Sequence, residues 1–165
     1  MSRAFTKESD GTDVFDDLPD RALSTHPNFV TARGLGLIEA EVERHRARLA
    51  QAQSAADRAA IAAASRDLRY WSARRASARQ VDSPISLTEA RFGTIVTIRR
   101  DDGRTQRFRI VGEDEADPVR GLLSYVSPLA RAIIGKKVGD IVPVARGEAE
   151  ILTIEAGGDA SEGAP

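Results

Sequence analysis

Two runs of apolar residues at helical spacing follow one another in the first half of the chain. The first run begins behind Thr31, a residue type that favours helix N-termini, and both runs repeat at intervals of three and four residues. This spacing is typical of a coiled-coil seam. The expected seam positions are Leu35, Ile38, Val42, His45, Leu49 and Ala52, then Ile61, Ala64, Leu68, Trp71, Arg75 and Ala78. Because only a short break near residues 53–56 separates the runs, they predict an antiparallel helical hairpin over residues 31–80.

The second half of the chain shows the alternation of short strands. Strands are expected at residues 94–98, 106–111, 122–126, 141–144 and 148–154. Pro128 suits the first turn of a single helix that ends near Ile134. In the second strand Phe108 lies on one face of the sheet, whereas Arg107 and Arg109 lie on the other. Short strands with one helix predict a small α+β domain over residues 81–156.

The two ends of the chain lack periodicity. Residues 1–30 are polar and acidic and are predicted to be disordered, and residues 157–165 are predicted to be a flexible tail. The first residues contain no apolar stretch of the kind found in signal peptides, and no apolar run reaches the length of a membrane span. Cysteine is absent, which excludes disulfides and thiolate metal sites. We therefore expect a cytoplasmic protein with no membrane contact.

The net charge of −1 conceals an uneven distribution. Residues 31–79 contain ten arginines against five acidic residues, so the predicted hairpin is basic. Arg66, Arg69, Arg74 and Arg75 could steer it toward an acidic partner or a nucleic acid, or they could simply be solvated.

Few residues are candidates for catalysis or metal binding. The chain has two histidines, His26 and His45, and the second occupies a seam position, where packing is the simpler role. The acidic run that includes Asp114, Glu115 and Asp117 is interpreted as a turn rather than a metal cluster. We therefore expect no catalytic residue, no bound metal and no cofactor.

The C-terminal half carries a family resemblance. The strings IVGEDEAD (110–117) and LSYVSPLARAIIGKKVGDIV (123–142), preceded by RDDGRTQRFRIVG (100–112), resemble the C-terminal domain of bacterial Gre transcription elongation factors, most closely the GreB branch. Thr31 and Gly34 extend the resemblance weakly to the hairpin. It implies an α+β fold in which the hairpin coiled coil precedes an FKBP-like domain with a small antiparallel sheet and one short helix.

The resemblance also implies a partner and a mechanism. Gre factors bind RNA polymerase at the rim of its secondary channel and insert the coiled coil toward the active site. Two acidic residues at the tip, in the pattern Asp-x-x-Glu-Asn, help to hold a Mg²⁺ ion of the polymerase, which then cleaves backtracked RNA. Such a factor is not itself an enzyme, needs no cofactor of its own and touches nascent RNA at most indirectly.

The tip of this chain departs from that pattern. Asp57 stands at the first acidic position and Arg58 follows it, but Ala60 replaces the glutamate and Ile61 the asparagine. Asp57 could be a remnant of the acid pair or an N-cap of the second helix, and the cap is the preferred interpretation. The arms are also shorter than those of the family by about two turns, or roughly 12 Å. Weak or absent cleavage stimulation is therefore expected.

The segment that meets the polymerase in the family is largely retained. Ser127, Pro128, Leu129 and Arg131 are carried over as polymerase-binding residues, whereas Val126 replaces a residue that is commonly acidic or polar.

Other functions stay open at this stage. The chain could regulate a different protein, such as nucleoside diphosphate kinase, or it could be an active cleavage factor that uses Asp57 with Asp67. An FKBP-like fold also raises prolyl isomerisation, but no aromatic-lined pocket is evident, and an inert result is expected. The oligomeric state is not determined by the sequence.

Overall fold

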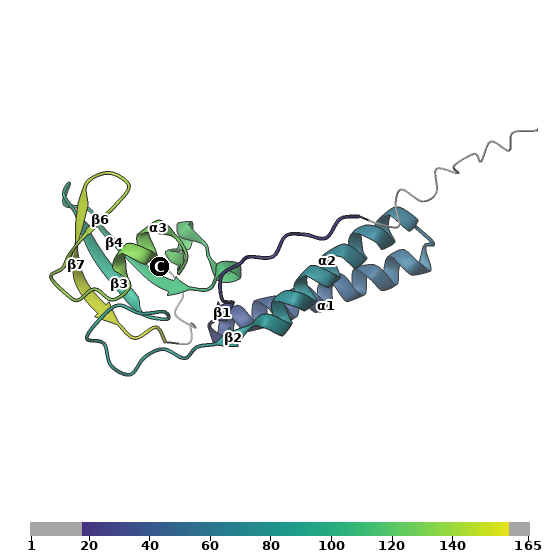
Figure 1. The fold of residues 1–165 in the computed structure, drawn as a ribbon, viewed down its shortest axis with the longest axis horizontal. Coiled ribbons are helices and arrows are strands. Elements are labelled where there is room, and N and C mark those ends of the chain that lie inside the picture. The colour runs from purple at the N-terminus through teal and green to yellow at the C-terminus, as the bar shows by residue number, and fades with distance from the viewer. Residues whose placement is uncertain (1–17, 159–165) are drawn as a thin grey trace, which may run out of the picture.

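The computed structural model describes residues 18–158 as a helical hairpin joined to a sheet domain. Helices α1 (Ala32–Ser54) and α2 (Arg58–Ser77) run antiparallel, and the sheet lies beyond the base of the hairpin, where α1 begins and α2 ends (Figure 1). The predicted α+β class with an N-terminal helical hairpin is therefore confirmed.

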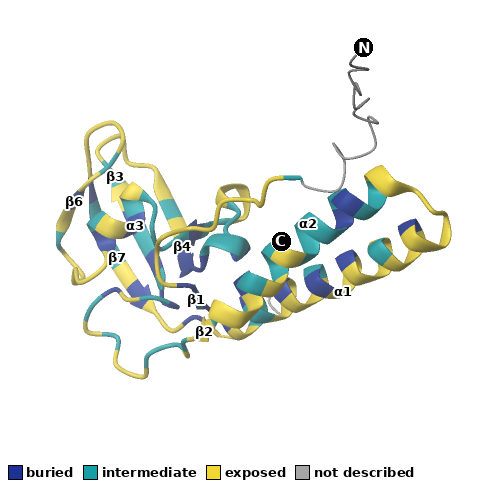
Figure 2. Ribbon diagram, turned by 45° about the vertical axis from the view of Figure 1, so that its right-hand side comes forward, coloured by how far each residue is buried: buried dark blue, intermediate teal, exposed yellow. Residues whose placement is uncertain are grey.

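The buried stripe of α1 follows the predicted seam, with Ile38, Val42, His45 and Ala52 all buried (Figure 2). The stripe of α2 differs from the prediction at its C-terminal end. There Arg74 is buried and Arg75 is exposed, so the placement of Arg75 in the seam is wrong. The reason is that the end of α2 packs against the sheet domain as well as against α1.

Five strands form one sheet in the order β5-β4-β3-β7-β6. They are β3 (Ile95–Arg100), β4 (Thr105–Val111), β5 (Leu122–Ser124), β6 (Ile141–Pro143) and β7 (Glu148–Glu155). The prediction of an antiparallel sheet is wrong at one pair, because β5 runs parallel to β4, with Leu122 opposite Arg109. Two short 3₁₀ helices, η1 (Glu113–Glu115) and η2 (Pro118–Arg120), return the chain along β4 between these strands and so produce the parallel pair.

The core of the sheet domain lies between one sheet face and helix α3 (Pro128–Ile133). Ile98, Ile110, Ile133 and Ile151 are completely buried there. Each such side chain contributes roughly 1.5–3 kcal/mol relative to its exposed state. This core holds α3, and with it the segment Ser127–Arg131, in a fixed position on the domain.

Residues 18–30 are more ordered than expected. Phe29–Val30 forms strand β1, which pairs in parallel with β2 (Arg79–Gln80), so the expectation of disorder is wrong for residues 29–30. Residues 18–27, called the strap below, run along α2 from the direction of the hairpin tip to the base (Figure 1). The expectations for residues 1–17 and 159–165 lie outside the described residues.

Candidate functional site

The turn between α1 and α2 forms the tip of the hairpin, at the end remote from the sheet (Figure 1). Asp57 caps α2, since its Oδ1 accepts a hydrogen bond from the backbone N–H of Ala60 at 3.0 Å. The preferred interpretation of Asp57 as a cap is thus confirmed. Arg58 begins α2 and is exposed. Ala56 has φ +52°, a left-handed conformation that residues with a β-carbon rarely adopt. The tip therefore offers one carboxylate, already engaged with backbone.

Just below the tip the two helices are loosely packed. A cavity of about 370 Å³ is lined mostly by alanines and by the polar side chains of His45, Arg48, Gln51, Asp57 and Asp67. His45 is buried, with Nε2 at 3.2 Å from Arg44 Nη2 and 3.5 Å from a Glu41 carboxylate oxygen. Burial, reinforced by the charge of Arg44, lowers the pKa of His45. Its Nδ1 has no partner among the described residues.

The four predicted polymerase-binding residues lie together in one short segment. Ser127 caps α3 by accepting a hydrogen bond from the N–H three residues ahead at 3.2 Å, and Pro128 occupies the first turn. Leu129 is half-buried and packs on the core, so it holds the segment in place. Arg131 is exposed, 3.4 Å from Nε2 of His26 in the strap. The structure separates this segment from the hairpin tip by the length of the hairpin (Figure 1).

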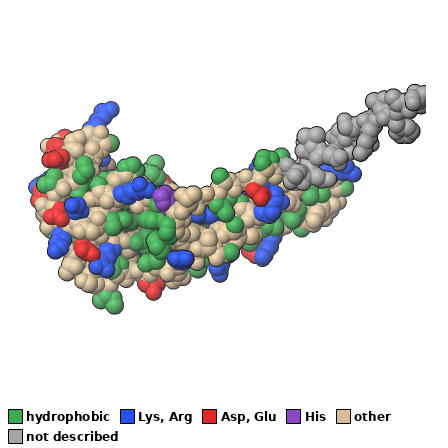
Figure 3. Space-filling view, in the orientation of Figure 1, with side chains coloured by type: hydrophobic (Ala, Val, Ile, Leu, Met, Phe, Trp, Pro, Cys, Tyr) green, Lys and Arg blue, Asp and Glu red, His purple; other side chains and the backbone are tan. Residues whose placement is uncertain are grey.

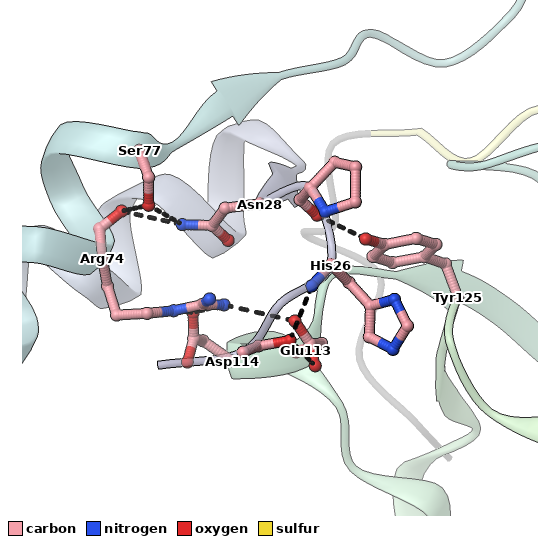
Figure 4. Close-up of polar contacts among 9 residues, drawn as sticks. His26, Asn28, Arg74, Ser77, Glu113, Asp114 and Tyr125 are labelled. Atoms are coloured by element: carbon pink, nitrogen blue, oxygen red, sulfur yellow. Dashed lines mark hydrogen bonds and ion pairs between the residues drawn. The ribbon is translucent and has the colours of Figure 1, made fainter. Parts of the chain in front are cut away.

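Three aromatic rings join this segment to the base of the hairpin. Tyr125 lies 5.6 Å from Phe29 and 5.9 Å from Phe92, measured between ring centroids. Its hydroxyl donates a hydrogen bond to the backbone carbonyl of Pro27 (Figure 4). Burial, together with the nearby carboxylate of Glu113, raises the pKa of Tyr125. The phenol is therefore a neutral donor across the physiological range, and it ties the strap to the sheet domain.

A buried arginine fixes the hairpin to the sheet domain. Arg74, near the end of α2, is 3% exposed, and its Nε and Nη2 donate to one Asp114 oxygen at 2.8 and 2.6 Å (Figure 4). A Glu113 oxygen lies 3.7 Å away. The side-chain amide of Asn28 donates to the carbonyl of Arg74 at 2.7 Å. Helix α2, η1 and the residue before β1 therefore meet at one charged cluster, called the hinge cluster below.

The other helix is attached through a second carboxylate of η1. Glu115 is buried, accepts a hydrogen bond from the Thr31 hydroxyl at 2.5 Å and pairs with Arg33 at 3.3 Å. A β-carbon added at Gly34 would lie 2.9 Å from Glu115, so glycine allows this approach. The acidic run predicted to be a turn is a turn, and its carboxylates bind the hairpin. Within residues 18–158 no group of three or more His, Asp or Glu could hold a metal ion.

The four arginines proposed to steer the hairpin are individually paired, Arg74 with Asp114 as described above. Arg66 pairs with Asp67, Arg75 with Glu39, and Arg69 with Asp20 of the strap. Figure 3 shows basic side chains of the visible face as separate groups rather than one continuous surface. The predicted alternative of a steering surface therefore receives little support from these side chains, each of which has an acidic partner.

Two aromatic residues of α2, Tyr70 and Trp71, lie against Arg21 of the strap. The Arg21 guanidinium lies 3.8 Å from the centroid of the Tyr70 ring and 5.9 Å from that of Trp71. Trp71 is only half-buried, so the expectation that it lies in the seam core is met in part. Sequence reasoning missed the strap and the hinge cluster. The residues that could have indicated the hinge cluster are Asn28, ahead of the Thr31 cap, and Arg74, next to the seam. Both residue types are too common at such positions to predict a contact.

The described part of the chain contains no helix long and apolar enough to span a bilayer. The extent of similarity to known proteins differs between the two halves of the molecule. The family model described as transcription elongation factor, GreA/GreB, C-term matches residues 85–156. This range holds the whole five-stranded sheet, η1 and α3.

Individual relatives also match over only part of the chain. Transcription elongation factor GreB of Neisseria meningitidis serogroup B is 40% identical over 96 residues, which are 54% of this chain and 59% of that protein. Transcription elongation factor GreA of Alkalilimnicola ehrlichii is 48% identical over 67 residues, which are 39% of this chain and 42% of that protein. The chain thus spans about half the length of the curated relatives it matches.

Among solved structures, the GreA factor homolog 1 (Gfh1) protein of Thermus thermophilus aligns with 79% of this chain and 100% of its own length. Its sequence identity is 18% and the TM-score is 0.37, too low to support an argument about function or domain arrangement. The identification therefore rests on residues 85–156 and on the curated relatives. Residues 85–156 thus form a domain that matches the C-terminal domain family of the transcription elongation factors GreA and GreB.

Proposed function

We propose that this chain is a regulator of transcription elongation that binds RNA polymerase at the rim of the secondary channel. The family of its C-terminal domain and the geometry of the α3 segment support the partner. Ser127 and Pro128 are held rigidly by capping, and Arg131 is exposed beside them. A preorganised segment of this kind loses little conformational entropy on binding.

We further propose that the hairpin enters the channel without stimulating RNA cleavage. The state of Asp57 carries this proposal, because its carboxylate caps α2 and Ala60 supplies no second acid. Asp67 lies ten residues further, about 15 Å along the helix. It is also engaged by Arg21 at 3.5 Å and Arg66 at 3.2 Å. A Mg²⁺ ion in the polymerase would thus gain at most one capped carboxylate ligand from the tip.

The first test is retention on immobilised core RNA polymerase. The parent chain should be retained, and Arg131→Ala should weaken retention severalfold, because this exposed charge lies in the proposed interface. Arg104→Ala is the matched control, since Arg104 is an exposed arginine in the β3–β4 turn and pairs only with Asp102. Failure of the parent chain to bind would refute the polymerase assignment, and capture of nucleoside diphosphate kinase instead would favour that alternative partner.

The second test is cleavage of RNA in a stalled, backtracked complex. The expected result is that the chain binds without shortening the RNA. When an active Gre factor is added, the chain should reduce the cleavage that this factor stimulates, because the two compete for the channel. Metal-dependent shortening by the parent chain, abolished in Asp57→Ala, would overturn the proposal of an inactive tip. The two tests are independent, since the first concerns the α3 segment and the second the hairpin tip.

A further inference from the structure

Arg109 is a buried cation without a counter-ion among residues 18–158. Its strand neighbours Phe108 and Ile110 point into the core, so Arg109 points to the opposite face of the sheet. The residue is 8% exposed, and its Nε is enclosed with no hydrogen-bond partner. No described carboxylate lies within 4.0 Å of the guanidinium. Arg74, the other buried arginine, is by contrast fully engaged by Asp114.

A buried charge in a folded protein is ordinarily paired, because removing it from water is costly. The environment of Arg109 shows where a partner would fit. A cavity of about 270 Å³ adjoins it, lined also by Thr31, Ala32, Gln80, Val81, Asp82, Ser83 and Gly157. Such a volume suits a small polar group with its waters rather than a large apolar ligand.

The electrostatics of the cavity favour an anion. Ala32 is the first residue of α1, a helix of 23 residues, so the cavity adjoins the positive end of the helix dipole. The first N–H groups of a helix have no partner within the helix. Arg109 adds a full positive charge in a planar form that binds two oxygens at once.

Two carboxylates lie in this region, and neither neutralises Arg109. Asp82 lines the cavity, but it accepts a hydrogen bond from the Gln80 amide at 3.3 Å and is exposed. Glu115 lies near the start of α1 and pairs with Arg33. Asp82 would oppose a bound anion, so its charge provides a means of tuning the affinity.

We propose that this cavity is an oxyanion site in which Arg109 binds a phosphate or carboxylate group. The group would touch three separate segments, namely the start of α1, the linker at residues 80–83 and strand β4. It would thereby join the hairpin base to the sheet. Two sources supply this chemistry: a free phosphate-bearing ligand, or the carboxylates of Asp159 and Glu162, which come two and five positions after the lining residue Gly157 in the sequence.

The test is titration of the full chain with inorganic phosphate, with chloride at equal ionic strength as the comparison. Binding is measured by calorimetry and by the shift of the thermal midpoint of unfolding. Saturable binding is expected, and Arg109→Gln should weaken it by about tenfold or more, as expected for loss of a charge-assisted pair. Arg107→Gln is the matched control and should bind as the parent does, because Arg107 is exposed on the same strand and pairs with Glu155 at 2.9 Å. Asp82→Asn should tighten binding by removing a like charge.

A second arm distinguishes the two sources. If the chain's own carboxylates fill the site, the parent will not respond to phosphate, whereas the double variant Asp159→Asn with Glu162→Gln will. If parent and double variant respond alike, the site takes a free oxyanion. The proposal is overturned if neither responds, or if adding Arg109→Gln to the chain that does respond leaves its phosphate binding unchanged. Should Arg109→Gln fail to fold, unchanged affinity in Asp82→Asn would overturn it instead.

Discussion

The two ends of the hairpin are built in opposite ways. At the base, Arg74, Glu115 and Asn28 form buried charged and polar contacts with distant parts of the chain. At the tip, the helices meet through alanines around a cavity, and the turn is held by the Asp57 cap. Contacts that fix the direction of the hairpin are thus concentrated at its base, whereas the tip turns have few and should open most easily.

The largest effect should come from breaking the hinge cluster. Arg74→Met leaves Asp114 without its partner in a nearly buried site, and such a loss typically costs about 3–5 kcal/mol of unfolding free energy. Arg75→Met is the matched control. Arg75 pairs with Glu39 at 2.8 Å, but both side chains are about half exposed, so a loss of about 0–1 kcal/mol is expected. Denaturant unfolding of the two variants measures both, and equal losses would show that the hinge cluster is not a special point of attachment.

A smaller effect is expected at the tip. Asp57→Ala removes the cap of α2 and should cost about 1 kcal/mol, since the N–H of Ala60 loses its acceptor. Arg58→Ala, one residue further, should be neutral or slightly stabilising, because it removes a positive charge from a helix N-terminus. Hydrogen exchange should show the loss confined to the tip turns. A loss spread to the base amides would mean that the hairpin unfolds as one unit.

The smallest effect is a dependence on pH in the middle of the hairpin. Because burial lowers the pKa of His45 below its ordinary 6.5, the unfolded chain binds the proton first as the pH falls. Arg44 and Arg48 add to the lowering, while Asp67 and Glu41 oppose it. Stability should therefore be complete above about pH 6.5 and decline below it toward the folded-state pKa. Urea unfolding at several pH values should show this decline in the parent and a smaller one in His45→Gln.

The elements of this fold could be predicted because their signals are local. The three-and-four spacing, the Thr31 cap and the alternation around Phe108 each act within a few residues. The choice between Arg74 and Arg75 as the buried residue could not be predicted in the same way. One residue is a rotation of about 100° on a helix, and which side faces inward depends on the partner packed there. That partner, η1, lies about 40 positions further along the chain.

The same reasoning explains the missed strap and the misjudged strand pair. Residues 18–27 have no periodicity, and their order comes from contacts with Arg69, Tyr70 and Tyr125, which only the folded chain brings near. The parallel pairing of β5 depends on two 3₁₀ turns whose direction has no simple sequence pattern. For the candidate site, the resemblance pointed to the α3 segment, whose role stays a prediction, and the acidic residue at the tip was correctly interpreted as a cap. Arg109 could be recognised as a buried charge without a described counter-ion only from the folded structure.

The parallel pairing of β1 with β2 has a mechanical consequence. The chain enters the hairpin beside the point where it leaves, and the two connections are hydrogen-bonded to each other. The hairpin is therefore an arm that is held at both of its chain ends and is free at the tip. Its length is that of the 23 residues of α1, or roughly 34 Å. On such an arm, a rotation of about 10° at the base displaces the tip by about 6 Å, which is more than the rise of one helical turn. The two-residue ladder and the hinge cluster thus together determine the direction of the whole arm.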